Sequence, residues 1–280
     1  MKKPDFIGLG AQKAGTSWIY ACLYEHPHIC IPRKEIHFFS RRRNWVHGYD
    51  WYENLFSSCP ADNIKGEFST TYLYDRETPE RIFSRYPGLK LIACLRNPAD
   101  RAFSNYINDI KSGSMPKNIS FREAQKSRPE YIEQGRYAGQ LHRYLSRFPR
   151  SHMQILIYED IEKDPLTFIR SLYGFLGVDT HVTPSMIHDR INIARIPRYA
   201  AVDNGMNRIA ELMRRCGGHR IAWAVKKSGL PDLIRSLNTT GQQESALRLS
   251  GEERIDIYNA LKDDIDQVEH ITGRELTEWR

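Results

Sequence analysis

The chain has 280 residues, of which 40% are hydrophobic and 27% charged, and a formal net charge of +7 at pH 7. A chain of this size can bury one large α/β core. Because no stretch rich in Pro, Gly and Ser divides it, we predict a single domain over residues 1–280. No apolar run is long enough for a signal peptide or a membrane span, which predicts a soluble cytoplasmic protein. The positive charge favours anionic ligands without distinguishing a nucleotide from a nucleic acid or an acidic sugar.

The cysteines give no sign of a metal site. They number five and are scattered along the chain, at Cys22, Cys30, Cys59, Cys94 and Cys216. An odd set without paired spacing is typical of neither a zinc site nor a disulfide framework. In a cytoplasmic protein we therefore expect reduced packing cysteines, no disulfide and no metal ion.

Strand and helix patterns alternate along the first two thirds of the chain. Short apolar runs that end in polar loops predict strands at 5–9, 89–95 and 154–158. A fourth strand is predicted around 64–68. Apolar residues at helical spacing predict helices at 17–25, 79–86, 99–111, 137–148, 165–176, 205–215 and 252–271. This alternation predicts an α/β fold with a central parallel sheet flanked by helices.

The first predicted strand runs into a glycine-rich turn and a helix. Gly10 and Gly15 lie five residues apart and are followed by Thr16 and Ser17, which is the frame of a phosphate-binding, P-loop-like turn. A nucleotide-hydrolysing loop carries lysine directly after its second glycine, whereas this chain has Lys13 within the loop. A dinucleotide fingerprint fails as well, because it needs glycine where Lys13 stands. The segment favours a phosphorylated nucleotide, although a glycine-rich turn without a ligand stays open.

Residues 31–39 hold two candidate bases. Glu35 and His37 occupy alternate positions, where both could project to one side of an extended stretch. A hydroxyl or amine acceptor must lose a proton as it attacks, and a carboxylate or an imidazole can take that proton. Pairing of either group with Arg33, Lys34 or the arginines at 41–43 is the structural alternative. The aromatic residues at 38–39 and 49–52 either line an acceptor pocket or pack in the core.

The strand predicted at 89–95 ends in Arg96, at the edge where parallel sheets bind ligands. Ser104 follows about two helical turns later. A guanidinium and a hydroxyl could together hold a second phosphate, whereas a structural ion pair of Arg96 is the alternative. Farther on, residues 192–249 are basic and irregular, which fits a solvated face or a flap over an anionic ligand.

Three motifs together resemble the sulfotransferases that use 3′-phosphoadenosine 5′-phosphosulfate (PAPS). They are Gln12-Lys13-Ala14-Gly15-Thr16-Ser17, Lys34-Glu35-Ile36-His37-Phe38-Phe39, and Leu95-Arg96-Asn97-Pro98 followed by Ser104. Further segments similar to that family lie at 66–72, 137–149, 158–165, 175–177 and 272–279. The second motif is most similar to bacterial members and to the heparan sulfate sulfotransferase branch.

The resemblance implies a role for each motif. Lys13 would contact the bridging oxygen of PAPS and stabilise the leaving nucleotide, so that no metal is required. Glu35 would act as the general base and His37 would support it. Backbone and side-chain groups would bind the nucleotide, with Arg96 and Ser104 on its 3′-phosphate and a flap at about 190–250 that also forms an acceptor-side lid. The implied nucleotide-binding residues are Lys13, Ala14, Gly15, Thr16, Ser17, Trp18, Arg96, Ser104, Arg195 and Arg198.

We therefore predict a sulfotransferase that moves a sulfuryl group from PAPS to a hydroxyl, and secondarily an amine, of a small-molecule or glycan acceptor. Phe68 follows Glu67 where heparan-type members often carry lysine, which weakens the case for an anionic polysaccharide acceptor. Two alternatives stay open. A P-loop kinase or ATPase would need lysine after Gly15 and an acidic metal-binding strand end, and a basic nucleic-acid-binding protein would need exposed aromatics among its basic residues.

Overall fold

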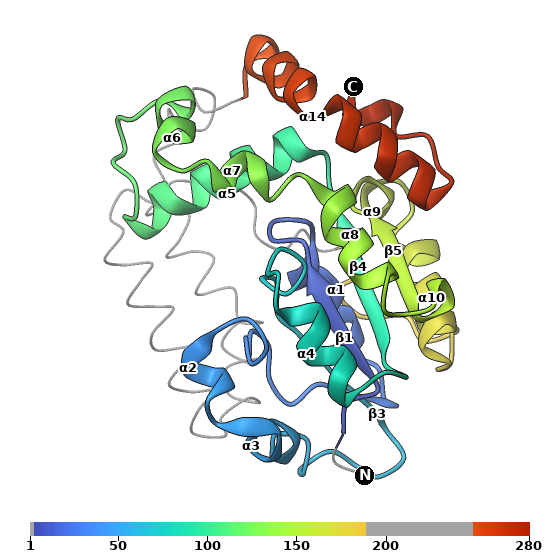
Figure 1. The fold of residues 1–280 in the computed structure, drawn as a ribbon. Helices are drawn as coiled ribbons and strands as arrows, with labels where there is room; N and C mark the ends of the chain where they lie inside the picture. The colour runs from blue at the N-terminus through green and yellow to red at the C-terminus, as the bar shows by residue number, and fades with distance from the viewer. Residues whose placement is uncertain (1–2, 189–248) are drawn as a thin grey trace, which may run out of the picture. The chain divides into compact units, whose positions relative to one another are not determined.

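A computed structural model describes residues 3–188 and 249–280 of the chain. Its centre is a wholly parallel sheet of five strands in the order β2-β3-β1-β4-β5 (Figure 1). The strands are β1 Phe6–Gly10, β2 Ile29–Cys30, β3 Ile64–Phe68, β4 Lys90–Leu95 and β5 Met153–Ile157. Every residue of β1 is buried, as expected for a strand covered on both faces. The predicted α/β fold and its four strands are confirmed, and the two-residue β2 is added.

Six of the predicted helices are present with slightly different bounds. They are α1 Thr16–Tyr24, α4 Thr78–Arg85, α5 Pro98–Ser112, α8 Tyr137–Leu145, α10 Pro165–Leu176 and α14 Gly251–Thr272. The helix predicted at 205–215 lies outside the described residues. Shorter helices were not predicted: α2 Arg42–Trp45, α3 Gly48–Asn54, α6 Phe121–Ser127, α7 Glu130–Glu133, α9 Glu159–Lys163, and the 3-10 turns Arg150–His152 and Thr277–Trp279. None of the described helices is both long and apolar enough to cross a membrane.

Helices cover both faces of the sheet. The chain passes from β1 towards β2 through α1 and in the opposite direction, from β3 to β4, through α4. Right-handed crossovers therefore place α1 and α4 on opposite faces. On the α1 face, the ring of Trp18 packs edge-on against Phe168 of α10, with 5.8 Å between ring centroids. On the α4 face, Phe83 packs against Phe148, just after α8, with centroids 5.2 Å apart.

Contacts divide the chain into two compact units. Among the described residues, the first unit comprises 3–102, 132–188 and 255–280 and contains the whole sheet. The second comprises 103–131 and 249–254. Within it, the ring of Phe121 packs on Tyr106, and Ser120 and Glu123 form a reciprocal capping box that starts α6. The single domain over 1–280 stays a prediction.

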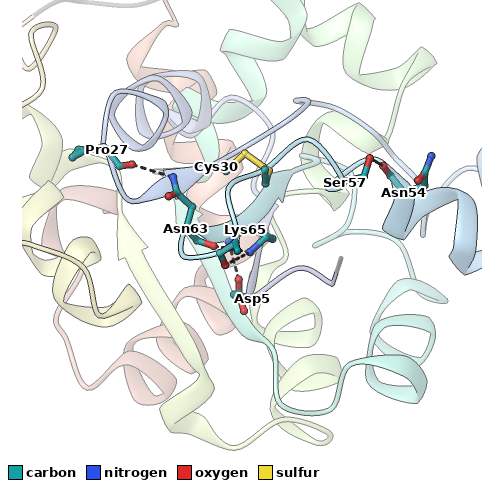
Figure 2. Close-up of a disulfide and its surroundings, with 9 residues drawn as sticks. Asp5, Pro27, Cys30, Asn54, Ser57, Asn63 and Lys65 are labelled. Atoms are coloured by element: carbon teal, nitrogen blue, oxygen red, sulfur yellow. Dashed lines mark hydrogen bonds between the residues drawn. A yellow bond between two sulfur atoms is a disulfide. The ribbon is translucent and has the colours of Figure 1, made fainter. Parts of the chain in front are cut away.

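The prediction of reduced cysteines is wrong for one pair, because Cys30 and Cys59 form a disulfide. Figure 2 shows it beside the turn that leads into β3, where the Asn63 side chain donates to the carbonyl of Pro27 over 3.0 Å. Parallel pairing of β2 with β3 brings together two cysteines that are 29 residues apart in sequence. The spacing of the cysteines in the sequence does not predict this contact. Because disulfides are rare in cytoplasmic proteins, the cysteines no longer support the prediction of a cytoplasmic protein. Cys22 and Cys94 are buried and free, whereas Cys216 lies outside the described residues.

Candidate active site

The turn between β1 and α1 needs its two glycines. Gly10 and Gly15 have φ values of +134° and +73°, in the region that favours glycine. A Cβ atom on Gly10 would lie 2.8 Å from the carbonyl oxygen of Thr70, and one on Gly15 would lie 2.8 Å from Cδ2 of Tyr158. Helix α1 then starts at Thr16 with no acidic residue in its first turn. Since first-turn N–H groups lack acceptors within their own helix, this turn fits an anionic group.

Lys13 and Arg96 meet at this edge of the sheet. Strands β1 and β4 are adjacent and parallel, so the residues that follow them lie at the same edge. The Arg96 guanidinium donates from Nη1 to the carbonyl oxygen of Lys13 over 3.1 Å. The guanidinium also lies over the ring of Tyr158, 4.5 Å from the centroid. The backbone carbonyl of Arg96 accepts from the Tyr137 hydroxyl over 2.9 Å. The guanidinium is thus held beside the loop that carries Lys13.

Glu35 and His37 form a direct pair. Glu35 Oε2 lies 3.1 Å from His37 Nε2. The other ring nitrogen of His37, Nδ1, forms a 2.8 Å hydrogen bond with Thr71 Oγ1. Thr70 donates to the same Glu35 oxygen from both its backbone nitrogen and its hydroxyl, each over 3.2 Å. The side chain of Glu35 is 34% exposed and that of His37 is 9% exposed, so Glu35 is the member of the pair that an acceptor can reach.

The surroundings of Glu35 favour its ionised form. Burial raises the pKa of this carboxyl, but the hydrogen bond from His37, the charges of Lys34 and His37 and the Thr70 amide together outweigh burial. The net pKa of Glu35 is below the ordinary value. The carboxyl group is therefore ionised at neutral pH, which is the state in which a general base can accept a proton.

The three predicted catalytic residues share an unusual backbone conformation. Lys13, Glu35 and His37 have φ values of 70°, 57° and 51°, and no other non-glycine residue in the described ranges has a positive φ. A side chain in this region costs about 1–2 kcal/mol, and such residues concentrate at functional sites. The conformation also corrects the expected extended stretch at Glu35 and His37. Their side chains meet because the backbone turns, not because they alternate along a strand.

Lys34 connects the two motifs. Its ammonium donates to the Ser17 hydroxyl over 2.7 Å and lies 5.5 Å from the centroid of the Tyr20 ring, both on α1. Burial lowers the pKa of Lys34, while the charge of Glu35 raises it. From the sequence, Lys34 was considered only as an ion-pair partner of Glu35 or His37. Its position beside the first turn of α1 brings a further positive charge to the candidate site.

The segment 66–72 was noticed in the sequence but received no function. In the structure it surrounds the Glu35–His37 pair, since Thr70 and Thr71 contact the two side chains and Phe68 accepts from the Glu35 backbone N–H over 2.7 Å. Adjacent pairing of β1 with β3 places this segment beside the turn between β1 and α1. The run of hydroxyl residues at 69–71, directly after the strand predicted at 64–68, was the available signal.

Several predicted residues lie elsewhere or are not described. Ser104 is half-buried on α5 in the second unit, so its pairing with Arg96 stays a prediction. Arg195 and Arg198, together with the flap predicted at about 190–250, fall among the residues that are not described. The ring of Trp18 packs in the core, and the backbone N–H of Trp18 donates to the carbonyl of Gly15 over 2.9 Å.

The aromatic residues after His37 belong to the core. Phe38, Phe39 and Tyr52 are fully buried, and Phe38 stacks on Tyr52 with ring centroids 4.6 Å apart. Core packing, rather than an acceptor pocket, is therefore confirmed for these three rings. Over 3–188 and 249–280, no group of three His, Cys, Asp or Glu residues is arranged to hold a metal ion.

The chain matches a known protein family. A family model described as "Sulfotransferase domain" matches residues 3–196. The chain belongs to the sulfotransferase domain family. Membership in this enzyme family favours the sulfotransferase interpretation over the kinase and nucleic-acid-binding alternatives.

The similarity of this sulfotransferase domain to individual proteins is distant. It is 31% identical over 199 residues to the human bifunctional heparan sulfate N-deacetylase/N-sulfotransferase 3, which covers 64% of this chain and 23% of that protein. It is also 31% identical over 186 residues to human heparan sulfate glucosamine 3-O-sulfotransferase 6, covering 64% and 54%. The chain thus spans between about a quarter and about half of these curated relatives.

A solved structure matches over nearly the full length. The crystal structure of a sulfotransferase from Alicyclobacillus acidocaldarius has a TM-score of 0.72 and 25% sequence identity, and the match covers 99% of each chain. The resemblance inferred from the three sequence motifs is therefore confirmed at the level of family and fold.

Proposed function

We propose that this sulfotransferase domain transfers the sulfuryl group of PAPS to an acceptor hydroxyl and releases adenosine 3′,5′-bisphosphate (PAP). One observation carries the proposal beyond family membership. The non-glycine residues with a left-handed backbone in the described ranges are Lys13, Glu35 and His37, the same three that the motifs nominate for catalysis. Backbone strain of this kind persists where surrounding contacts hold it, as they do around Glu35.

The donor would bind at the turn between β1 and α1. The backbone N–H groups of Gly15, Thr16 and Ser17 and the hydroxyls of Thr16 and Ser17 suit the 5′-phosphosulfate, because this helix start carries no acidic residue. Those of Ala14 and Trp18 donate to the carbonyls of Ala11 and Gly15, so they would bind the donor only once these bonds are released. Arg96 offers a planar fork of donors for the 3′-phosphate, with Ser104, Arg195 and Arg198 as further contacts. Release of the Arg96 hydrogen bond to the carbonyl of Lys13 would free that fork for the ligand.

The transfer itself would be an in-line displacement at sulfur. The acceptor oxygen attacks sulfur while Glu35 takes the hydroxyl proton, and the bond from sulfur to the bridging phosphate oxygen breaks. The electron pair of that bond stays on the 5′-phosphate of PAP, where the Lys13 ammonium stabilises the new charge. Lys13 thus supplies the positive charge that a metal ion supplies in phosphoryl transfer, and no metal is required.

The acceptor is proposed as a hydroxyl, and secondarily an amine, of a small molecule or a glycan. Two relatives are named for heparan sulfate, one as an N- and one as a 3-O-sulfotransferase. In this chain Phe68 is 1% exposed and packs edge-on against Phe6, so this position offers no charge to an anionic polysaccharide. A first acceptor panel would combine N-desulfated heparan sulfate, heparan sulfate with free hydroxyls, and uncharged small alcohols and phenols.

Two variants test the assigned roles. Lys13→Ala should lower PAP formation from PAPS by two orders of magnitude or more, in line with the loss of one preorganised charge contact. Glu35→Gln should lower transfer by a factor of roughly 10²–10⁴ while PAP binding is retained. Lys262→Ala, on the exposed face of α14, is the matched control and should retain full turnover. Turnover near wild type in Lys13→Ala would refute the leaving-group role.

A further inference from the structure

Glu67 is a fully buried carboxylate that the proposed chemistry does not use. It lies in β3 with 0% exposure. Three hydroxyls donate to it: Tyr72 to Oε1 over 2.7 Å, Tyr52 to Oε1 over 3.2 Å, and Ser69 to Oε2 over 2.7 Å. A buried carboxylate with three donors is costly to assemble, so its hydroxyl partners indicate what it holds in place.

Two of these hydroxyls reach the loop that carries the candidate base. The backbone N–H of His37 donates to Ser69 Oγ over 2.8 Å, and that of Phe38 donates to the Tyr72 hydroxyl over 2.8 Å. A hydroxyl has one proton to donate, so donation to Glu67 leaves its lone pairs for these two N–H groups. The carboxylate therefore orients both hydroxyls towards the loop.

The loop depends on such contacts because no helix or strand includes Glu35 or His37. Both residues have a left-handed backbone, which is unfavourable by itself. Their backbone N–H groups donate to Phe68 and Ser69, at the end of β3 and just beyond it. The conformation that brings Glu35 to His37 is thus held from the segment 67–72.

We propose that Glu67 is a positioning residue that fixes the Glu35–His37 pair through the hydroxyls of Ser69 and Tyr72. Glu67 does not touch the acceptor or the donor. It holds the backbone of the loop and thereby fixes the position of the Glu35 carboxylate relative to the acceptor hydroxyl. A displacement of about 1 Å at such a position can lower the rate of catalysis by about two orders of magnitude. The proposal rests on the proposed function of Glu35 as the general base.

Tyr52 supplies an internal control. Its hydroxyl donates to the same Glu67 oxygen as that of Tyr72, and its ring is equally buried. Among the described hydrogen bonds, however, the Tyr52 hydroxyl accepts nothing from residues 35–39, whereas that of Tyr72 accepts from Phe38. Tyr52→Phe and Tyr72→Phe therefore remove the same chemical group and the same kind of bond to Glu67. Only Tyr72→Phe severs the connection to the loop.

The test compares these two variants in the full chain by two measurements. Turnover of PAPS with the best acceptor of the panel should fall at least tenfold in Tyr72→Phe and less than twofold in Tyr52→Phe, with the Kd for PAP unchanged in both. Amide hydrogen exchange of the peptide that contains His37 and Phe38 should accelerate in Tyr72→Phe alone. Ser69→Ala should act like Tyr72→Phe, and Glu67→Gln should do so where it folds.

Equal turnover and equal loop exchange in the two tyrosine variants would overturn the positioning role. Exchange is measured without an acceptor, so the comparison is decisive even when turnover is slow. The two proposals fail separately. If Glu35→Gln retains turnover, the proposed base is wrong. If Glu35→Gln loses turnover but Tyr52→Phe and Tyr72→Phe have equal turnover and equal loop exchange, only the role of Glu67 is contradicted.

Discussion

Removal of the Cys30–Cys59 disulfide should destabilise the fold by an amount that the chain topology sets. The two cysteines are 29 residues apart in sequence. A cross-link that closes a loop of this length lowers the entropy of the unfolded chain by roughly 12 cal/mol/K, which corresponds to about 3.5 kcal/mol at 25 °C. For a chain of this size, such a loss should lower the melting temperature by about 6 °C.

The assay compares the wild type with the Cys30→Ser, Cys59→Ser double variant in thermal unfolding, with and without a reductant. Reduction should bring the wild type to the melting temperature of the double variant and leave the double variant unchanged. Unfolded wild type without reductant should expose three free thiols out of its five cysteines, because two are bonded. Five free thiols and no effect of reductant would show that the cysteines are reduced, and would refute this reasoning.

Three further predictions concern the candidate site. Lys13→Gly should be more stable than Lys13→Ala by about 1 kcal/mol, since only glycine relieves the left-handed backbone. Both variants should form PAP from PAPS more slowly than the wild type by two orders of magnitude or more. Gly15→Ala places a Cβ 2.8 Å from the Tyr158 ring at a φ of +73°, so it should lower both the melting temperature and the affinity for PAP in calorimetry. Burial raises the pKa of Glu67 to about 7, partly offset by its hydroxyl donors. The pKa of Glu67 is higher in the folded chain than in the unfolded chain. The contribution of this carboxyl to the free energy of unfolding is therefore fully present below about pH 4.5, and it falls by roughly 3 kcal/mol as pH rises through 7. Glu67→Gln should abolish this slope in urea titrations.

The sequence predicted the parts of the fold that depend on local pattern. Strands β1 and β4 are almost wholly apolar and buried, which is the pattern of a strand covered on both faces. Strand β3 contains Lys65 and Glu67, so its pattern was weaker, and its prediction is nevertheless confirmed. The glycines at 10 and 15 predicted the turn before α1 because their positions demand a missing Cβ atom. Strand β2 has two residues, too few to show a periodicity.

The features that were missed depend on contacts between distant segments. The disulfide joins Cys30 in β2 to Cys59 in the loop before β3, and no residue near Cys30 indicates that Cys59 lies beside it. The pairing of Glu35 with His37 was anticipated, but from an extended backbone that the positive φ values exclude. The role of Tyr72 is visible only in three dimensions, because its hydroxyl joins Glu67 to Phe38 across segments far apart in sequence.

The proposed PAPS site at the turn between β1 and α1 can be tested by ligand stabilisation. The melting temperature would be measured with PAP, with adenosine 5′-phosphate and with Mg²⁺-ATP at equal concentration. At about 100 times its dissociation constant, a ligand stabilises the fold by roughly 2.7 kcal/mol, which raises the melting temperature by several degrees. With a PAPS site at this turn, we expect this increase with PAP, a much smaller one with adenosine 5′-phosphate, and no difference between the two ligands in Arg96→Ala. An increase with Mg²⁺-ATP and none with PAP would contradict the PAPS site.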